Sequence, residues 1–157
     1  MQRSHLRVDR WALCVLVALA GCASVPMASA EADAASKTFA SPPAGKAGVY
    51  VFRNSFAGQA LTKSVYLDGT LVGETANKVY LYCVVDSGDH TVSTESEFGN
   101  NDVRWHADAG KNYFFRQYMK LGVFVGGANL EAVEEEEGKK EVLVCKLGVV
   151  KHGSGVP

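Results

Sequence analysis

The residues with the clearest chemical meaning form the run Leu19-Ala20-Gly21-Cys22, near the start of the chain. A leucine three residues before a cysteine, with two small residues between them, is the pattern that a lipoprotein signal peptidase accepts. Cleavage before Cys22 leaves a sulfur that can carry a lipid and a new amino group that can carry an acyl chain. The spacing therefore predicts a signal peptide over residues 1–21 and lipidation of Cys22.

The segment before this run has the charge and length of a signal peptide. Arg3, Arg7 and Arg10 form a positively charged flank, and residues 11–20 are apolar. About 10 apolar residues are too few for a membrane-spanning helix, which needs about 20, but they suit the apolar region of a signal peptide. A buried helix of the mature fold is the alternative, and no capping residue leads into it.

A second cleavage site competes with the first. Ala28-Ser29-Ala30 is an A-x-A pattern, and cleavage after Ala30 would release a soluble periplasmic protein. The site at Cys22 is favoured because it directly follows the apolar run, whereas cleavage after Ala30 would leave a spacer that contains Pro26. Ala23 follows Cys22, which is compatible with sorting to the outer membrane of a Gram-negative cell, facing the periplasm.

The remaining cysteines are candidates for a disulfide. Cys14 leaves with the signal peptide and Cys22 takes the lipid, so Cys83 and Cys145 form an even pair in an oxidising compartment. Closing a loop of about 60 residues would stabilise the fold by about 4 kcal/mol. The alternative is two buried reduced thiols, which behave as small apolar side chains.

Other residues offer little chemistry. The histidines lack the close pairing of metal ligands; we expect His90 to bond the local backbone at a turn and His106 to face solvent. The acidic run 134–137 lacks a calcium-binding loop pattern and indicates a solvated surface. No nucleophile or phosphate-binding motif is present. The sequence predicts no enzyme activity, no catalytic residue, no cofactor and no metal.

Composition bounds the organisation and the partners. The chain has a formal charge of −1 and no basic stripe, so nucleic acid is an unsuitable partner. Residues 22–45 are rich in alanine, serine and proline and are predicted to be a flexible tether. One domain is expected over residues 46–148, followed by a disordered tail over 149–157.

Within that domain the dominant hydrophobic period is two, which is typical of strands. Asp68-Gly69 predicts a hairpin turn, and residues 79–85 are apolar on both faces, which indicates a central strand. Residues 134–147 place acidic before basic side chains and favour a short helix over a charged hairpin, although Gly138 weakens the helix by about 1 kcal/mol. The pattern predicts an antiparallel β-sandwich with strands at 49–53, 63–68, 71–74, 79–85, 91–95, 103–107, 113–119 and 122–133.

Three segments carry a resemblance to the PEGA-type β-domain: Tyr66-Leu67-Asp68-Gly69, Val72-Gly73-Glu74-Thr75 and Gly88-Asp89-His90-Thr91-Val92. The wider chain resembles a family of small bacterial lipoproteins with a β-rich domain of unknown function. The matching segments there are 49–53, 109–113, 124–127, 137–141 and 145–147. The resemblance implies a PEGA-like or immunoglobulin-like sandwich and an envelope location, and it brings no catalytic residues.

These observations lead to one expected function and one alternative. The expected function is a lipid-anchored envelope protein whose non-catalytic β-sandwich has a structural or binding role toward an envelope protein, a peptide or a glycan. Its edge strands suit the addition of a partner strand. The alternative is a soluble periplasmic module that binds peptide or glycan after cleavage at Ala30.

Overall fold

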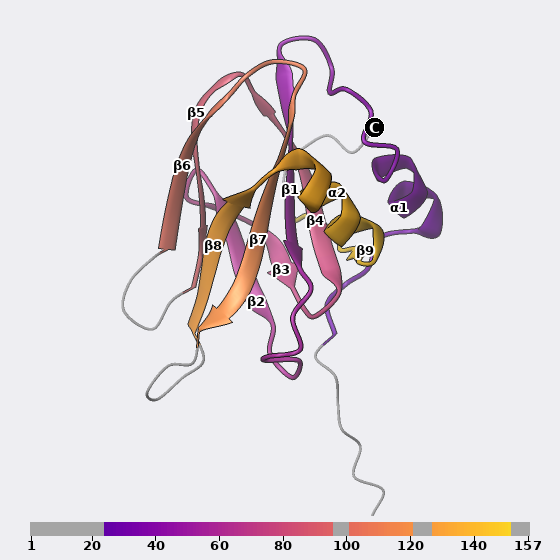
Figure 1. Cartoon of the computed structure of the whole chain (residues 1–157), viewed down its shortest axis with the longest axis vertical. Coiled ribbons are helices and arrows are strands. Elements are labelled where there is room, and N and C mark those ends of the chain that lie inside the picture. Colours follow the sequence, from indigo (N-terminus) through magenta and orange to yellow (C-terminus); the bar gives the residue numbers. More distant parts are fainter. Residues whose placement is uncertain (1–23, 96–100, 121–126, 152–157) are drawn as a thin grey trace, which may run out of the picture.

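Two β-sheets face each other in the computed structural model, which describes residues 24–95, 101–120 and 127–151 (Figure 1). The larger sheet has the strand order β8-β7-β1-β4-β9, and the smaller sheet has the order β3-β2-β5-β6. Most strand pairs are antiparallel. The predicted mainly β sandwich with a short helix near the carboxyl end is therefore confirmed.

The larger sheet mixes two pairing directions. β1 pairs antiparallel with β4 and parallel with β7, and the two-residue β9 pairs parallel with β4. These parallel pairs depart from the expected purely antiparallel arrangement. The strands are β1 (Lys46–Arg53), β4 (Val79–Asp86), β7 (Asn112–Lys120), β8 (Gly127–Val133) and β9 (Lys146–Leu147).

The smaller sheet contains the predicted hairpin. Asp68 and Gly69 have φ angles of 50° and 76°, so both residues adopt the left-handed conformation that a tight two-residue hairpin turn requires. All pairs in this sheet are antiparallel. Its strands are β2 (Lys63–Leu67), β3 (Thr70–Thr75), β5 (Gly88–Thr94) and β6 (Asn101–Ala107).

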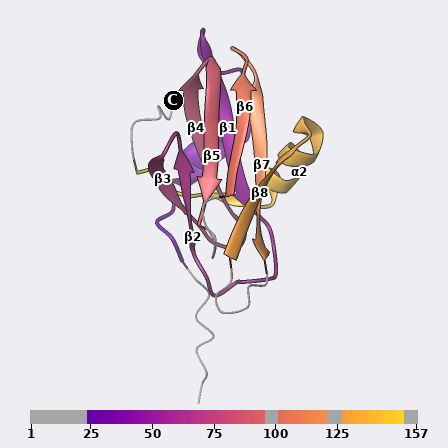
Figure 2. The ribbon, with the colours of Figure 1, turned by 90° about the vertical axis from the view of Figure 1, so that its left-hand side faces the viewer.

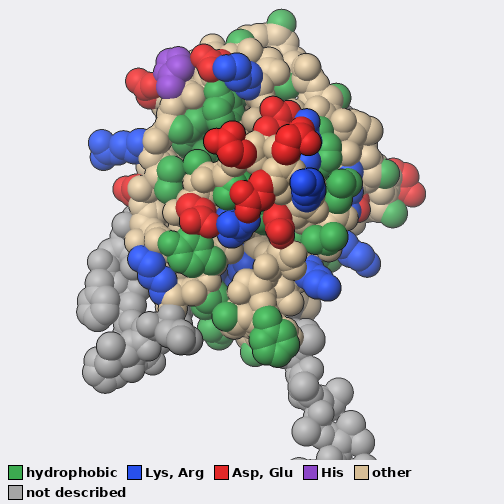
Figure 3. Space-filling model, viewed as in Figure 1, with side chains coloured by type: hydrophobic (Ala, Val, Ile, Leu, Met, Phe, Trp, Pro, Cys, Tyr) green, Lys and Arg blue, Asp and Glu red, His purple; other side chains and the backbone are tan. Residues whose placement is uncertain are grey.

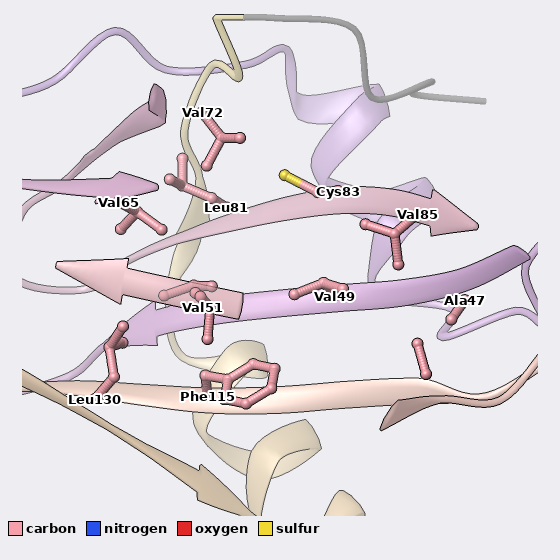
Figure 4. Close-up of a cluster of buried hydrophobic side chains, with 12 residues drawn as sticks. Ala47, Val49, Val51, Val65, Val72, Leu81, Cys83, Val85, Phe115 and Leu130 are labelled. Atoms are coloured by element: carbon pink, nitrogen blue, oxygen red, sulfur yellow. The ribbon is translucent and has the colours of Figure 1, made fainter. Parts of the chain in front are cut away.

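A hydrophobic core fills the space between the sheets (Figure 4). Alternate side chains of β4 point into it, and β1 contributes in the same way because successive residues of a strand face opposite sides. The buried members are Ala47, Val49, Val51, Val65, Val72, Leu81, Cys83, Val85, Val92, Ala107, Phe115 and Leu130.

A second cluster covers the outer face of the larger sheet. It is dominated by aromatic rings, and it makes β1 and β4 apolar on both faces, as predicted for the strand at 79–85. Helix α2 (Glu135–Leu143) packs here, beside β7 (Figure 2). The buried members are Tyr50, Phe52, Tyr80, Tyr82, Phe114, Val142, Cys145 and Leu147.

The expected helix after residue 134 is confirmed, and its glycine has a packing reason. Gly138 is buried against Phe114, and a Cβ added at Gly138 would overlap that ring. Glycine lowers helix propensity, but here it lets α2 approach the sheet closely. The first turn carries Glu135, Glu136 and Glu137, which interact favourably with the positive end of the helix dipole.

Candidate membrane-anchoring site

The lipidation candidate, Cys22, lies outside the described residues, which begin at Ser24. The site is therefore built from the segment that follows it. Val25 is buried with Ala76 and Val79. Two residues further along the chain, Met27 forms an isolated antiparallel bridge with Gly148.

The tether expected over residues 22–45 is wrong for the described part. The Ala28 amide donates to the Leu147 carbonyl at 2.9 Å, and the Val149 amide donates to the Pro26 carbonyl at 2.9 Å. The disordered tail expected over 149–157 is likewise wrong for its first residues, since the Lys151 amide donates to Val72 at 2.8 Å. Backbone hydrogen bonds between the two segments hold both of them in place, although the amino-acid composition of neither segment predicts an ordered structure.

A short helix, α1 (Ala30–Ser36), continues the segment. The Ser29 side chain accepts a hydrogen bond from the Ala32 amide at 3.2 Å and so caps the first turn. Ala32 packs against the aromatic cluster on the outer face of the larger sheet. The helix is too small to bury a large apolar stripe, so its position depends on polar contacts.

Asp33 is the centre of those contacts. One carboxylate oxygen accepts from the Tyr80 hydroxyl at 2.9 Å and from the Leu147 amide at 3.0 Å. The other accepts from Lys37 Nζ at 2.8 Å, and Lys37 also donates to the Cys145 carbonyl at 2.6 Å. Partial burial raises the pKa of Asp33, but the hydrogen bonds from Lys37, Tyr80 and Leu147 outweigh it and hold the pKa below its usual value.

Two buried tyrosines of the larger sheet complete this attachment. The Tyr50 hydroxyl donates to the Ser36 carbonyl at 2.9 Å, and the Ser36 and Tyr80 hydroxyls are hydrogen-bonded to each other. Burial raises the pKa of both tyrosines, so both phenols stay protonated. We call Asp33, Ser36, Lys37, Tyr50 and Tyr80 the helix clamp.

The candidate disulfide between Cys83 and Cys145 is not formed in the structure, in which both cysteines are buried, as in the alternative. Cys83 lies in the core between the two sheets, whereas Cys145 lies in the cluster on the outer face of the larger sheet. The Cys145 thiol instead donates to the Arg53 carbonyl at 3.8 Å. Burial raises the pKa of Cys145 to about 12, which makes it a poor nucleophile at neutral pH.

Residues that precede the clamp line a groove at one end of the sandwich. Ser24, Val25 and Met27 form one wall of this groove, which has a volume of about 320 Å³. The remaining lining residues are Ala76, Asn77, Lys78, Val79, Val144 and Lys146. The lining of the groove thus combines apolar side chains with two lysines.

The opposite end of β4 carries a histidine site. His90 Nδ1 lies 2.6 Å from Asp68 Oδ2, and its Nε2 lies 2.9 Å from the Asp86 carbonyl oxygen. The expected local backbone contact of His90 is therefore confirmed. Partial burial lowers the pKa of His90, but these two acceptors outweigh it and raise the pKa above its usual value.

A shallow cavity of about 500 Å³ adjoins His90 and is also lined by Asp89, Thr91, Arg104 and Trp105. The side chain of His106 is 65% exposed, as predicted, and its Nδ1 lies 2.6 Å from Asp89 Oδ1. Within the described ranges, no group of three or more histidine, cysteine, aspartate or glutamate side chains is placed to hold a metal ion.

The fold and the attached amino-terminal segment define a two-sheet β-protein with helices packed on one outer face. The chain belongs to the family described as "Protein of unknown function (DUF2846)", which matches residues 43–128. A relative from Haemophilus influenzae (strain ATCC 51907 / DSM 11121 / KW20 / Rd), named "Uncharacterized protein", is 50% identical over 135 residues. That alignment covers 86% of this chain and 80% of the relative.

No solved structure matches the chain significantly. The family match begins at residue 43, so α1 and the segment before it lie outside the matched region. Among the residues that the structure describes, no helix combines the length and the apolar character needed to cross a bilayer.

Proposed function

We propose that the protein is a non-catalytic, lipid-anchored component of the bacterial envelope. A lipid on Cys22 holds it in the outer membrane, facing the periplasm, and the β-sandwich has a structural or binding role toward an envelope protein, a peptide or a glycan. The helix clamp holds the segment that follows the proposed anchor against the domain. This differs from the long flexible tether that composition predicts.

The observation that carries the proposal is the packing of residues 24–29. Val25 is buried, Met27 is bridged to Gly148, and Ser29 caps α1. Cleavage after Ala30 would discard all three contacts, whereas cleavage before Cys22 keeps them in the mature protein. The packing therefore favours the lipoprotein cleavage site over the soluble alternative.

Two further features support the envelope proposal. The order of motifs resembles PEGA-type domains and small bacterial lipoproteins, and the turn at Asp68-Gly69 has the geometry that this resemblance implies. The helix clamp also uses its polar groups internally: Asp33, Lys37 and Ser36 bond to one another or to the sheet. Because these polar groups already have hydrogen-bond partners within the protein, the cluster is better suited to holding α1 against the sheet than to catalysis.

Mass spectrometry of the mature amino terminus tests the proposal. Expressed in a Gram-negative host, the wild-type chain should begin with a lipid-modified Cys22, and Cys22→Ser should lose the lipid and leave the membrane fraction. Ala30→Gln alters an exposed position and spoils the competing cleavage site, so it should leave the lipidated product unchanged. An unlipidated wild-type chain beginning at Glu31, blocked by Ala30→Gln, would refute the anchor.

A further inference from the structure

Large apolar side chains are exposed at the end of the sandwich where the described chain begins. Phe56, in the loop between β1 and β2, is 88% exposed, and Val144, just after α2, is 57% exposed. Met27 is 44% exposed. Figure 3 shows hydrophobic side chains at the lower end of the molecule, below the strands labelled in Figure 1.

The loop that carries Phe56 is held by hydrogen bonds from a buried arginine. Arg53 has no exposed surface, and its guanidinium donates to the carbonyls of Gly58 at 2.9 Å and Leu61 at 2.7 Å. The Ser55 amide donates to Asn77 Oδ1 at 3.1 Å, which joins the loop to the groove beside Ser24. Phe56 is thus displayed to solvent by a loop with defined contacts, although burial of such a ring is favourable.

Positive charge accompanies these apolar side chains. Lys78 and Lys146 line the groove, both are exposed, and neither forms a salt bridge with a residue that the structure describes. Most other lysines that the structure describes form salt bridges with acidic side chains, including Lys37, Lys46 and Lys63. Unpaired lysines beside exposed apolar groups match the chemistry of an anionic phospholipid surface.

The covalent chain links this surface to the anchor. Ser24 lines the groove and lies two residues after Cys22, and two extended residues span at most about 7 Å. A lipid on Cys22 would therefore enter the bilayer beside Met27 and the two lysines. This distance is too short to separate the domain from the lipid headgroups of the bilayer.

We propose that this end of the sandwich rests on the anionic bilayer into which the anchor inserts. Phe56 enters the headgroup region, and Lys78 and Lys146 contact phospholipid phosphates. We call these three residues with Met27 and Val144 the membrane-facing end. The inference rests on the proposed lipid anchor and adds a second contact, with a defined orientation of the domain.

Tryptophan fluorescence tests this orientation. Residues 22–157 contain one tryptophan, Trp105, which pairs with His90 at the opposite end of the sandwich. Lipidated protein carrying Phe56→Trp is reconstituted into vesicles of phosphatidylethanolamine and phosphatidylglycerol with brominated acyl chains. The indole introduced at position 56 should be strongly quenched, while wild-type protein, with Trp105 alone, should show little quenching and serves as the control.

A second pair of variants tests the lysines. Lys78→Gln combined with Lys146→Gln should reduce the quenching in the Phe56→Trp background, because each lysine near an anionic surface contributes about fivefold to partitioning. Lys46→Gln combined with Lys111→Gln removes two lysines at the opposite end and should leave the quenching unchanged. Equal effects of the two pairs would overturn the assignment of these lysines.

Sedimentation with the vesicles separates the two proposals. A lipidated Phe56→Trp chain that sediments while its introduced indole stays unquenched would overturn the membrane-facing end and leave the anchor intact. A mature chain that carries no lipid and remains in the supernatant would overturn the anchor, and this inference with it. Circular dichroism checks that every variant is folded, which is expected because the substituted side chains at positions 56, 78 and 146 are exposed.

Discussion

The Tyr80 hydroxyl donates a hydrogen bond to Asp33 across 2.9 Å, and this contact joins helix α1 to a strand of the larger sheet. The two residues are 47 positions apart in the sequence. The same carboxylate oxygen accepts from the Leu147 amide, so Asp33 connects three separate segments of the chain. The amino-terminal segment is thereby part of the folded domain.

Replacing Asp33 with asparagine should destabilise the protein. The change removes the negative charge that pairs with Lys37 and weakens the bonds from Tyr80 and Leu147, at a cost of about 1–3 kcal/mol. Urea unfolding measures the difference. Asp89→Asn, at a side chain that is 92% exposed, is the matched control, and an equal effect of the two changes would contradict the clamp.

The same carboxylate should make stability fall in acid. Because the pKa of Asp33 is lowered in the folded state, its contribution is complete above the ordinary value of 3.8 and is lost as the pH falls through the folded-state pKa. The difference in unfolding free energy between wild type and Asp33→Asn should shrink in that range. If this difference in unfolding free energy stays constant down to the pH at which the protein unfolds in acid, Asp33 is not ionised in the clamp.

His90 should produce the opposite pH dependence. Its folded-state pKa is raised, so its contribution is complete below the ordinary value of 6.5 and is lost as the pH rises through the folded-state pKa. Nuclear magnetic resonance titration of the ring should show the raised value. Asp68→Asn removes one acceptor and should move the value back down; an unchanged titration in that variant would exclude Asp68 as a cause.

Gly138→Ala should destabilise the domain even though alanine favours helices by about 1 kcal/mol. The new methyl group would overlap the Phe114 ring, and such overpacking costs about 1–3 kcal/mol. Thermal unfolding measures the loss. Phe114→Leu in the same chain should recover part of it, whereas Lys140→Ala, at an exposed position of α2, should have little effect.

Cys145 should resist alkylation in the native protein. Burial raises its thiol pKa to about 12, so little thiolate is present at neutral or mildly alkaline pH. Treatment with iodoacetamide followed by peptide mapping should modify Cys145 only after denaturation. Val144→Cys supplies an exposed thiol next to it that should react readily, and a Cys83–Cys145 linked peptide under non-reducing conditions would contradict the two-cluster arrangement.

Local patterns predicted much of the sandwich because its strands have strong local signals. The turn at Asp68-Gly69 and the two apolar faces of residues 79–85 both appear in the structure as expected. The parallel pairing of β1 with β7 was missed, since it joins Gly48 to Asn112 and no local pattern records such a distant register.

The attachment of the amino-terminal segment to the sandwich was harder to predict for a physical reason. Helix α1 is built from alanines and polar residues, so it shows no apolar period, and Asp33 holds it through partners far away in the chain. Ser29 followed by Glu31 and Asp33 was the local signal of a helix start. The pairing of Cys83 with Cys145 stayed open in the sequence because spacing alone does not tell which face of a sheet a distant cysteine occupies.

If Cys22 carries the proposed lipid, the pairing of Met27 with Gly148 also affects how a force on that lipid is transmitted to the protein. Force applied at Cys22 would reach the bridge and the Ala28–Leu147 hydrogen bond before it reached the strands of the sandwich. We expect these peripheral contacts to break first, followed by the helix clamp, before the strands of the two sheets separate. The amino-terminal segment would thus detach under force before the β-sandwich unfolds.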